Sequence, residues 1–199
     1  MYLPNGLNVH WEWARIRLMD PENPIAQNPA ENDEELLDLL DEEGLVIGRA
    51  RRGDAHGQPS LRHRAVHIFV VNPKGEFYLQ KRSRNKRVAP GLWDTSVGGH
   101  VPSGESYEEG ALRELEEELG IVLPDPSPLR RHHDWIWTSD LETEHTRTFI
   151  LKWDGPFHLN RTEVEDGRYW SMKEMERACG HGVLTENLEA ELKNLGLIP

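Results

Sequence analysis

The stretch from Gly99 to Ile121, GHVPSGESYEEGALRELEEELGI, constrains the fold more than any other part of the chain. It predicts a glycine-rich turn followed by a short, acidic helix. Ser106 and Glu109 have the Ser-x-x-Glu spacing of a capping box, so we expect the helix to begin at Ser106. Gly120 suits the left-handed residue that commonly ends a helix. The sequence therefore predicts a helix bounded by Ser106 and Gly120.

Three carboxylates of this helix face the same way. Residues three and four apart share a helix face, so Glu114, Glu117 and Glu118 project to one side. Such a cluster repels itself unless a cation neutralises it, and a hard divalent ion with oxygen ligands is the natural candidate. The simpler alternative is an acidic face in contact with solvent.

The spacing of the whole stretch favours the cation. Gly99 is followed after five residues by Glu105, and after seven more by Arg113-Glu114-Leu115-x-Glu117-Glu118-x-Gly120-Ile121. The chain here resembles the Nudix box of Nudix hydrolases at each of its specified positions. The resemblance extends over roughly residues 34–190 and implies an α/β fold, the Nudix α/β/α sandwich with a mixed sheet.

The resemblance also implies roles for the box residues. Glu117 and Glu118 would be the main metal ligands, Glu114 a further ligand or the group that orients water, and the Gly99 carbonyl an additional ligand. Mg²⁺ is favoured because all these ligands are oxygen, with Mn²⁺ as the alternative. The implied reaction is metal-dependent hydrolysis of a diphosphate linkage in a nucleotide or another diphosphate metabolite.

The other box residues are interpreted as structural. We expect Glu105 and Arg113 to form an ion pair that ties the loop to the helix, and Gly120 to end that helix. The residue that acts as general base varies within the family. Besides Glu114, the later-strand residues Glu144 and Glu165 are candidates.

Basic residues precede the box, in a chain that is otherwise acidic. Arg82 and Lys86 are the best candidates for binding phosphate oxygens, although a solvated loop is the simpler interpretation. Trp93 could line the substrate pocket or pack beneath the turn, because aromatic side chains serve both purposes. The full basic run is Lys81, Arg82, Arg84, Lys86 and Arg87.

A second resemblance concerns isopentenyl-diphosphate delta-isomerase, which shares the Nudix fold. The segments AHGQPSLRH, KRSRNKRVAPGLWDTSVGGH and ETEH are similar to it. In that family three histidines and two glutamates build a metal site beside a catalytic cysteine. The matching residues here are His56, His63, His100, Glu142 and Glu144. They could bind Zn²⁺ or Mn²⁺, or form a polar cluster without a metal.

The catalytic cysteine of the isomerases is replaced by Gly98. A glycine cannot deliver a proton to a carbon centre. This chain also keeps all three box glutamates, whereas the isomerases do not retain the full set. Hydrolysis is therefore the leading hypothesis and isomerisation is disfavoured. A non-catalytic Nudix-fold binding module is a third alternative, although a pure binder does not need three ligand carboxylates.

Residues 1–32 read as an N-terminal extension and residues 33–199 as the Nudix domain. Residues 9–18 alternate like a strand, and Trp11 and Trp13 could pack on the sheet, close the pocket or contact a second subunit in a homodimer. Later segments predict strand, turn and strand over 35–52, where the leucine run could also be a short helix. They also predict a hairpin over 62–83. One short strand is expected within 84–100, then three further strands and two terminal helices.

The net charge is −12, from 23 basic and 35 acidic side chains, which argues against binding to nucleic-acid polymers or anionic membranes. The expected partner is a small-molecule diphosphate. A single cysteine excludes an intramolecular disulfide and fits a reducing compartment. The sequence has no apolar run of transmembrane length and its start lacks a signal-peptide pattern, so we expect a cytoplasmic location.

Overall fold

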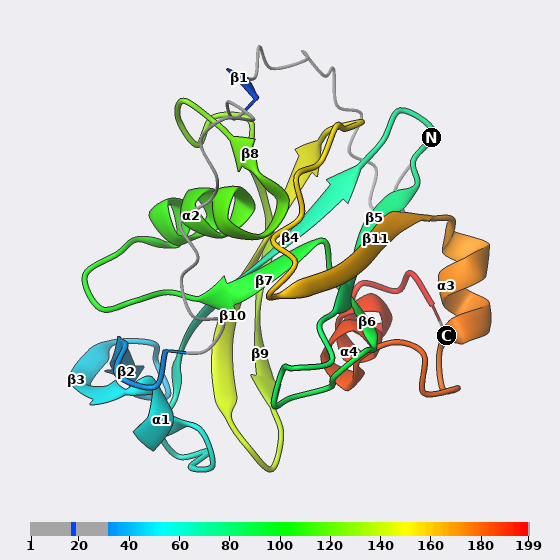
Figure 1. Cartoon of the computed structure of the whole chain (residues 1–199). Coiled ribbons are helices and arrows are strands. Elements are labelled where there is room, and N and C mark those ends of the chain that lie inside the picture. Colours follow the sequence, from blue (N-terminus) through cyan, green and yellow to red (C-terminus); the bar gives the residue numbers. More distant parts are fainter. Residues whose placement is uncertain (1–16, 19–31, 199) are drawn as a thin grey trace.

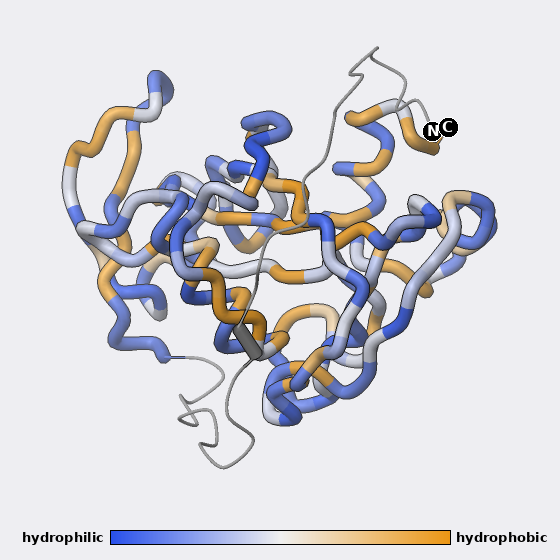
Figure 2. The backbone as a smooth tube through the Cα atoms, turned by 90° about the horizontal axis from the view of Figure 1, so that it is seen from above, coloured by the Kyte–Doolittle hydropathy of each residue, from blue (hydrophilic) through white to orange (hydrophobic). Residues whose placement is uncertain are grey.

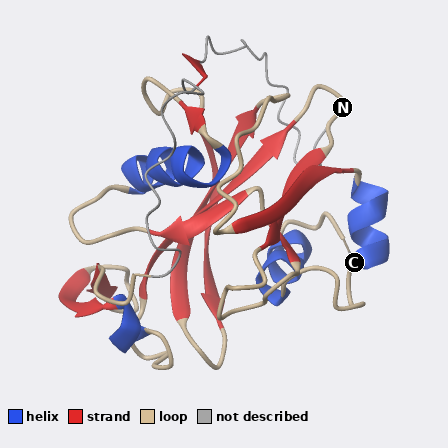
Figure 3. Cartoon of the chain, viewed as in Figure 1, coloured by secondary structure: helices blue, strands red, loops and turns tan. Residues whose placement is uncertain are grey.

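The computed structural model describes residues 17–18 and 32–198, and a seven-stranded mixed sheet forms its centre (Figures 1 and 3). Five strands cross the sheet in the order β11 (Val164–Trp170), β5 (Phe77–Arg82), β4 (His63–Val71), β10 (Thr143–Lys152) and β9 (Arg130–Thr138). β6 (Trp93–Asp94) pairs with β5, and β7 (Val97–His100) pairs with β4. β4 and β10 run parallel, whereas the other pairs in this sheet are antiparallel.

Helices cover both faces of the sheet. On one face, Leu115 of α2 (Tyr107–Leu119) packs in a core cluster with Val66 and Ile68 of β4. On the other, Phe69 of β4 joins a second cluster with α3 (Met172–Ala178) and α4 (Glu186–Asn194). Figure 2 shows hydrophobic residues in the interior and hydrophilic residues at many turns. The arrangement is the expected α/β/α sandwich with a mixed sheet.

The bounds of α2 confirm the prediction from its sequence. The Ser106 hydroxyl accepts a hydrogen bond from the Glu109 amide, and the Glu109 carboxylate accepts one from the Ser106 amide, which completes a capping box. Gly120 follows with φ 65°, the left-handed conformation that glycine adopts without strain. A side chain there would also collide with His158. The helix that carries the box carboxylates is therefore fixed at both ends by local chemistry.

A separate hairpin lies outside the central sheet. β2 (Leu36–Leu40) and β3 (Val46–Arg51) pair antiparallel and lead into α1 (Arg52–Ala55). The leucine run is therefore a strand, as in the strand–turn–strand alternative. The prediction of a single short strand within 84–100 is wrong, because two strands form there. β6 pairs with β5, whereas β7 pairs with β4. One continuous strand cannot make both pairings, so the strand is interrupted between β6 and β7.

Arg17–Leu18 forms β1, which pairs antiparallel with β8 (Ile121–Val122). The remainder of the strand predicted over 9–18, including Trp11 and Trp13, lies outside the described residues, as does the segment 19–31. Among the helices of the described part of the chain, none has both the length and the apolar surface needed to cross a membrane.

Candidate functional site

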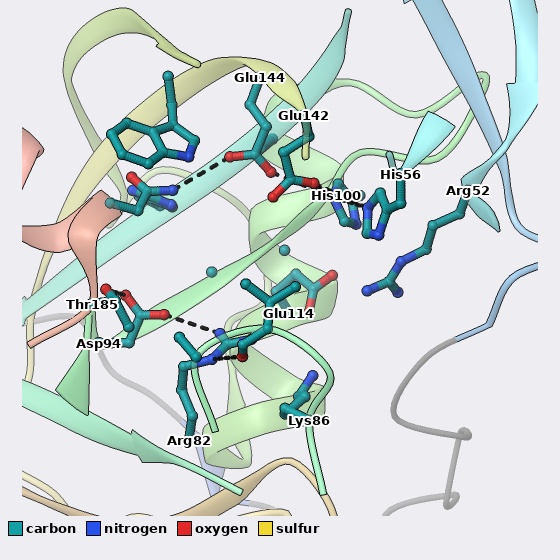
Figure 4. Close-up of a pocket in the computed structure, with 18 of the residues that line it drawn as sticks. Arg52, His56, Arg82, Lys86, Asp94, His100, Glu114, Glu142, Glu144 and Thr185 are labelled. Atoms are coloured by element: carbon teal, nitrogen blue, oxygen red, sulfur yellow. Dashed lines mark hydrogen bonds and ion pairs between the residues drawn. The ribbon is translucent and has the colours of Figure 1, made fainter. Parts of the chain in front are cut away.

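A cavity of about 540 Å³ opens beside β7, between the N-terminal part of the box and the start of α4 (Figure 4). Its walls come from β4, β7, α2, the β9–β10 turn and the loop after β5. Most of the residues singled out from the sequence meet here. The predicted site residues among the lining are Arg82, Lys86, Gly99, His100, Glu105, Arg113, Glu114, Glu117, Glu142, Glu144 and His56.

The box carboxylates lie at one end of this cavity. Glu114 and Glu117 line it directly, whereas Glu118 is buried behind β7 with 4% of its surface exposed. Glu118 accepts hydrogen bonds from the Gln80 side chain at 2.9 Å and the Gly98 amide at 3.3 Å. The helical spacing therefore brings the three carboxylates together as predicted, with one of them deeper than the other two.

Burial makes this negative cluster unfavourable. It raises the pKa of Glu114 to about 7, although the charge of Arg113 and its hydrogen bond act in the opposite direction. Burial also raises the pKa of Glu118 well above its ordinary value, and the nearby charges of Glu163 and Glu114 add to the effect. Carboxylates that resist ionisation in a cavity wall are poised to bind a cation that offsets their charge.

Two other box residues, Gly99 and Arg113, position the glutamates. A Cβ at Gly99 would lie 2.2 Å from the Glu114 carboxylate, so β7 can pass the helix this closely only as glycine. Arg113 donates to Glu114 at 2.7 Å and to Glu117 at 3.1 Å. Its Nε lies 3.3 Å from a Glu105 oxygen, which confirms the predicted ion pair. Arg113 thus bridges Glu114 and Glu117 through one nitrogen, Nη1, and ties them to the preceding loop through Nε.

A histidine-rich cluster lies on the neighbouring wall. His56, His63, His100 and Glu142 each offer a ligand atom, and these atoms all lie within 4.8 Å of one another. His56 Nε2 is 3.3 Å from His100 Nε2 and 3.1 Å from the Glu142 carboxylate. Glu144 lies beside the group, 3.4 Å from His100 Nε2. The structure therefore brings together all five residues of the second predicted site. Figure 4 shows His56, His100, Glu142 and Glu144 of this group.

The protonation of this cluster suits metal binding. Burial lowers the pKa of His56 to about 4 and that of His100 to about 3, so both rings are neutral near pH 7. The Nδ1 atom of His63 lies 3.1 Å from the Leu61 carbonyl, and its buried Nε2 has no hydrogen-bond partner among the described residues. A ring that donates from one nitrogen to a carbonyl and leaves the other free is typical of a metal ligand.

The two predicted phosphate-binding residues have carboxylate partners that the sequence did not suggest. Arg82 pairs with Asp94 at 3.0 Å, and Lys86 pairs with Glu163 at 2.8 Å. All four side chains line the cavity and are mostly buried. These pairs keep the cations at the wall in the absence of an anion. Arg82 and Asp94 are 12 residues apart and Lys86 and Glu163 are 77 apart, and neither separation follows a pattern of one strand or helix. Sequence reasoning therefore missed both carboxylates.

Two other candidates lie elsewhere. Trp93 packs in the second core cluster, with its ring centre 5.1 Å from that of Trp170, and is not among the cavity-lining residues of the described chain. Of its two suggested roles, the structure favours packing. Glu165 binds Lys81 outside the cavity, at 3.0 Å. Of the later-strand carboxylates, only Glu144 therefore stays a candidate for the base.

Residues at the start of α4 also reach the cavity and were not anticipated. Thr185 caps the helix and donates a hydrogen bond to Asp94 at 2.8 Å. Asn187 donates to Glu144 at 3.4 Å. A helix start at Thr185 can be read from the sequence, but its position beside β10 depends on tertiary packing.

Comparison with known proteins gives a consistent result. The sequence profile of the NUDIX domain matches residues 61–188. An uncharacterised Nudix hydrolase of Streptomyces coelicolor is 48% identical over 94 residues, which are 47% of this chain and 51% of that protein. The chain thus spans about half the length of this curated relative.

Two further relatives align over more of the chain. The isopentenyl-diphosphate delta-isomerase 2 of Photorhabdus laumondii is 36% identical, with 68% of this chain and 77% of that protein covered. The crystal structure of DR0079 from Deinococcus radiodurans superposes with a TM-score of 0.67 and 27% identity, covering 81% of this chain and 99% of the other.

Proposed function

The chain belongs to the Nudix family, and from this premise we propose that it is a Mg²⁺-dependent phosphohydrolase. Its reaction would be hydrolysis of a diphosphate linkage in a nucleotide or another diphosphate metabolite. The observation that carries the proposal is the buried carboxylate cluster of α2 beside Gly99, whose charge calls for a cation at the cavity wall.

The donor set fits a hard cation. Glu114, Glu117, Glu118 and the Gly99 carbonyl would hold it, and all are oxygen donors, which suit Mg²⁺ and also Mn²⁺. When bound, such an ion neutralises diphosphate oxygens and lowers the pKa of a water molecule. Arg113 would orient Glu114 and Glu117 through its two short hydrogen bonds.

The basic pairs beside the α2 carboxylates would receive the phosphate. Lys86 and Arg82 can exchange their present partners, Glu163 and Asp94, for phosphate oxygens, because both cations already face the cavity. The carboxylates released by this exchange stay nearby. Glu163 then joins Glu114 and Glu144 as a candidate to accept the proton of the attacking water.

We also propose that the histidine-rich cluster holds a second metal ion. Three imidazole nitrogens and carboxylate oxygens, from His56, His63, His100, Glu142 and Glu144, are the donors that Zn²⁺ and Mn²⁺ accept. The unpartnered His63 Nε2 supports this assignment.

Isomerisation of isopentenyl diphosphate is the second candidate. The relatives that carry this name and the convergence of the five cluster residues favour it. Gly98 opposes it, because no side chain at that position can give a proton to an alkene carbon. Formation of dimethylallyl diphosphate by the purified protein would support this candidate.

The proposal is tested by phosphate release from a panel of diphosphates. Nucleoside diphosphates and triphosphates, nucleotide sugars and prenyl diphosphates are incubated with Mg²⁺, and products are identified by mass. Glu117→Gln and Glu118→Gln should each abolish hydrolysis. Glu116→Gln is the matched control, because Glu116 lies exposed on the same helix. Unchanged turnover in both site variants would refute the proposal, and tight binding without cleavage would indicate a binding module.

The remaining assignments rest on the sequence. We propose a small-molecule diphosphate as the partner, action in the cytoplasm, and a Nudix domain over residues 33–199 after the extension 1–32. A homodimer with Trp11 and Trp13 at the interface stays a prediction, because both residues lie outside the described part of the chain.

A further inference from the structure

His67 lies at the wall of the cavity that faces α4, and the proposed hydrolysis assigns it no role. Its side chain is 7% exposed, and its Nδ1 atom lies 2.7 Å from the carboxylate of Glu191. Glu191 is fully buried on α4 and also accepts a hydrogen bond from the hydroxyl of Thr148. The ring of His67 is thereby fixed in orientation, since rotation would separate it from a buried anion.

The second ring nitrogen of His67 faces the space above Gly98. A Cβ at Gly98 would lie 3.4 Å from His67 Cδ2 and 3.7 Å from Nε2, and both residues line the cavity. Among the hydrogen bonds of the described residues, the His67 ring takes part only through Nδ1. Gly98 is not among the described glycines with a positive φ, so its backbone does not require glycine. What the missing side chain provides is access to Nε2.

Charge determines what Nε2 offers. A fully buried carboxylate needs a compensating cation, and two rings lie against Glu191: His67 at 2.7 Å and His133 at 3.6 Å. Burial lowers the pKa of His133, so the cation is the hydrogen-bonded ring of His67. Burial opposes the charged form of His67, but the charge of Glu191 and its hydrogen bond prevail and raise the pKa of His67 to about 9. Both nitrogens then carry protons near pH 7, so Nε2–H is a donor directed at the cavity.

A second polar atom reaches the same end of the cavity. Asn187 precedes Glu191 by four residues on α4, so the two side chains share a helix face. Asn187 lines the cavity, and its Oδ1 atom is buried without a hydrogen-bond partner in the described part of the chain. This end of the cavity is therefore polar, although the neighbours of His67 on β4 belong to the hydrophobic core.

We propose that His67 donates a hydrogen bond to an oxygen on the organic part of the substrate, and that Gly98 keeps this donor accessible. The inference rests on the proposed function, which sets the diphosphate at the α2 carboxylates. It names the substrate class as diphosphates with a polar organic group, such as a nucleoside or a sugar. A prenyl chain in the same position would cover the His67 N–H without giving it an acceptor, and such mismatches are strongly rejected.

The test measures binding with probes that cannot be hydrolysed. α,β-Methylene-ADP is the polar probe and dimethylallyl methylenebisphosphonate the hydrocarbon probe, both titrated calorimetrically with Mg²⁺ present. Wild-type protein should bind the polar probe at least about ten-fold more tightly, as expected for a hydrogen bond to a charged donor. Gly98→Ala adds a methyl group at an ordinary contact distance from His67 and should remove most of this preference.

Two further variants separate recognition from folding. His67→Ala leaves Glu191 buried without its cation, so the double variant His67→Leu/Glu191→Leu is measured beside it. Both should weaken the polar probe about 10- to 100-fold and the hydrocarbon probe far less. His181→Ala is the control, because His181 is exposed and outside the cavity lining.

The inference is overturned if wild-type protein binds both probes equally, prefers the hydrocarbon probe or binds neither. It is also overturned if Gly98→Ala and the double variant leave the ratio of the two affinities unchanged. Turnover does not enter these measurements. A protein that prefers the polar probe and hydrolyses no member of the substrate panel would refute the proposed hydrolysis while supporting the role of His67.

Discussion

Replacing Glu114 by glutamine should stabilise the metal-free protein at alkaline pH. The pKa of Glu114 is raised from 4.5 to about 7, and its side chain is 12% exposed, so solvent screens this effect little. At 1.36 kcal/mol per pH unit, this rise in the pKa of Glu114 corresponds to roughly 3 kcal/mol, which already includes the attraction of Arg113. Glutamine has the shape of the protonated acid and avoids this cost.

The sign of the pH dependence follows from proton binding. Below pH 4.5 both the folded and unfolded states keep the proton, and Glu114 costs nothing. Between pH 4.5 and about 7 only the folded state keeps it, so the free energy of unfolding falls as the pH rises. Above about pH 7 the whole penalty is present. The advantage of Glu114→Gln should therefore grow from zero at pH 4.5 to about 3 kcal/mol at pH 8.

Urea unfolding followed by tryptophan fluorescence, with a chelator present, measures this difference at each pH. In a thermal scan it corresponds to about 6–12 °C for a domain of this size. Adding Mg²⁺ at 100 times its dissociation constant should return about 2.7 kcal/mol to wild-type protein and less to the variant. Glu116→Gln should follow wild-type protein throughout. Parallel curves for wild-type protein and Glu114→Gln, with equal responses to Mg²⁺, would refute the reasoning.

Three other changes have defined outcomes. Gly99→Ala drives a methyl group against Glu114 and should lower the affinity for Mg²⁺ about 10- to 100-fold in calorimetric titration, with a near-native circular dichroism spectrum. Lys86→Ala should raise the KM for the diphosphate about ten-fold, whereas Lys81→Ala, which loses an ion pair outside the cavity, should not. His63→Ala should remove one Zn²⁺ or Mn²⁺ equivalent from the protein in metal analysis, while His181→Ala retains it. Retention of that equivalent by His63→Ala would exclude the cluster as its site.

Local sequence signals predicted α2 because the interactions that bound it are local. The Ser106 capping box spans four residues and Gly120 acts through its own backbone. Strand alternation located β4 and β5 for the same reason, and their hairpin turn was readable. The histidine cluster was reached through resemblance, since residues at the end of α1, on β4, β7 and β10 and in the β9–β10 turn share no spacing that chemistry alone would identify.

The partners that complete the cavity could not be read from the sequence. Lys86 and Glu163 are 77 residues apart, and His67 and Glu191 are 124 residues apart. No local pattern links such positions, and each pair forms only because sheet and helix packing brings it together. The role of Trp93 was undecided for a similar reason, because an aromatic residue beside a turn can face either the cavity or the core.

The parallel pairing of β4 with β10 bears on when the histidine cluster can exist during folding. His63 and Glu144 are register partners in this pair, about 80 residues apart in the chain. Because the intervening loop must close before such partners meet, we expect this pairing to form late in folding. An ion held by both strands therefore adds stability after the main folding barrier. Its measurable effect should be slower unfolding of the native protein, with little change in the rate of folding.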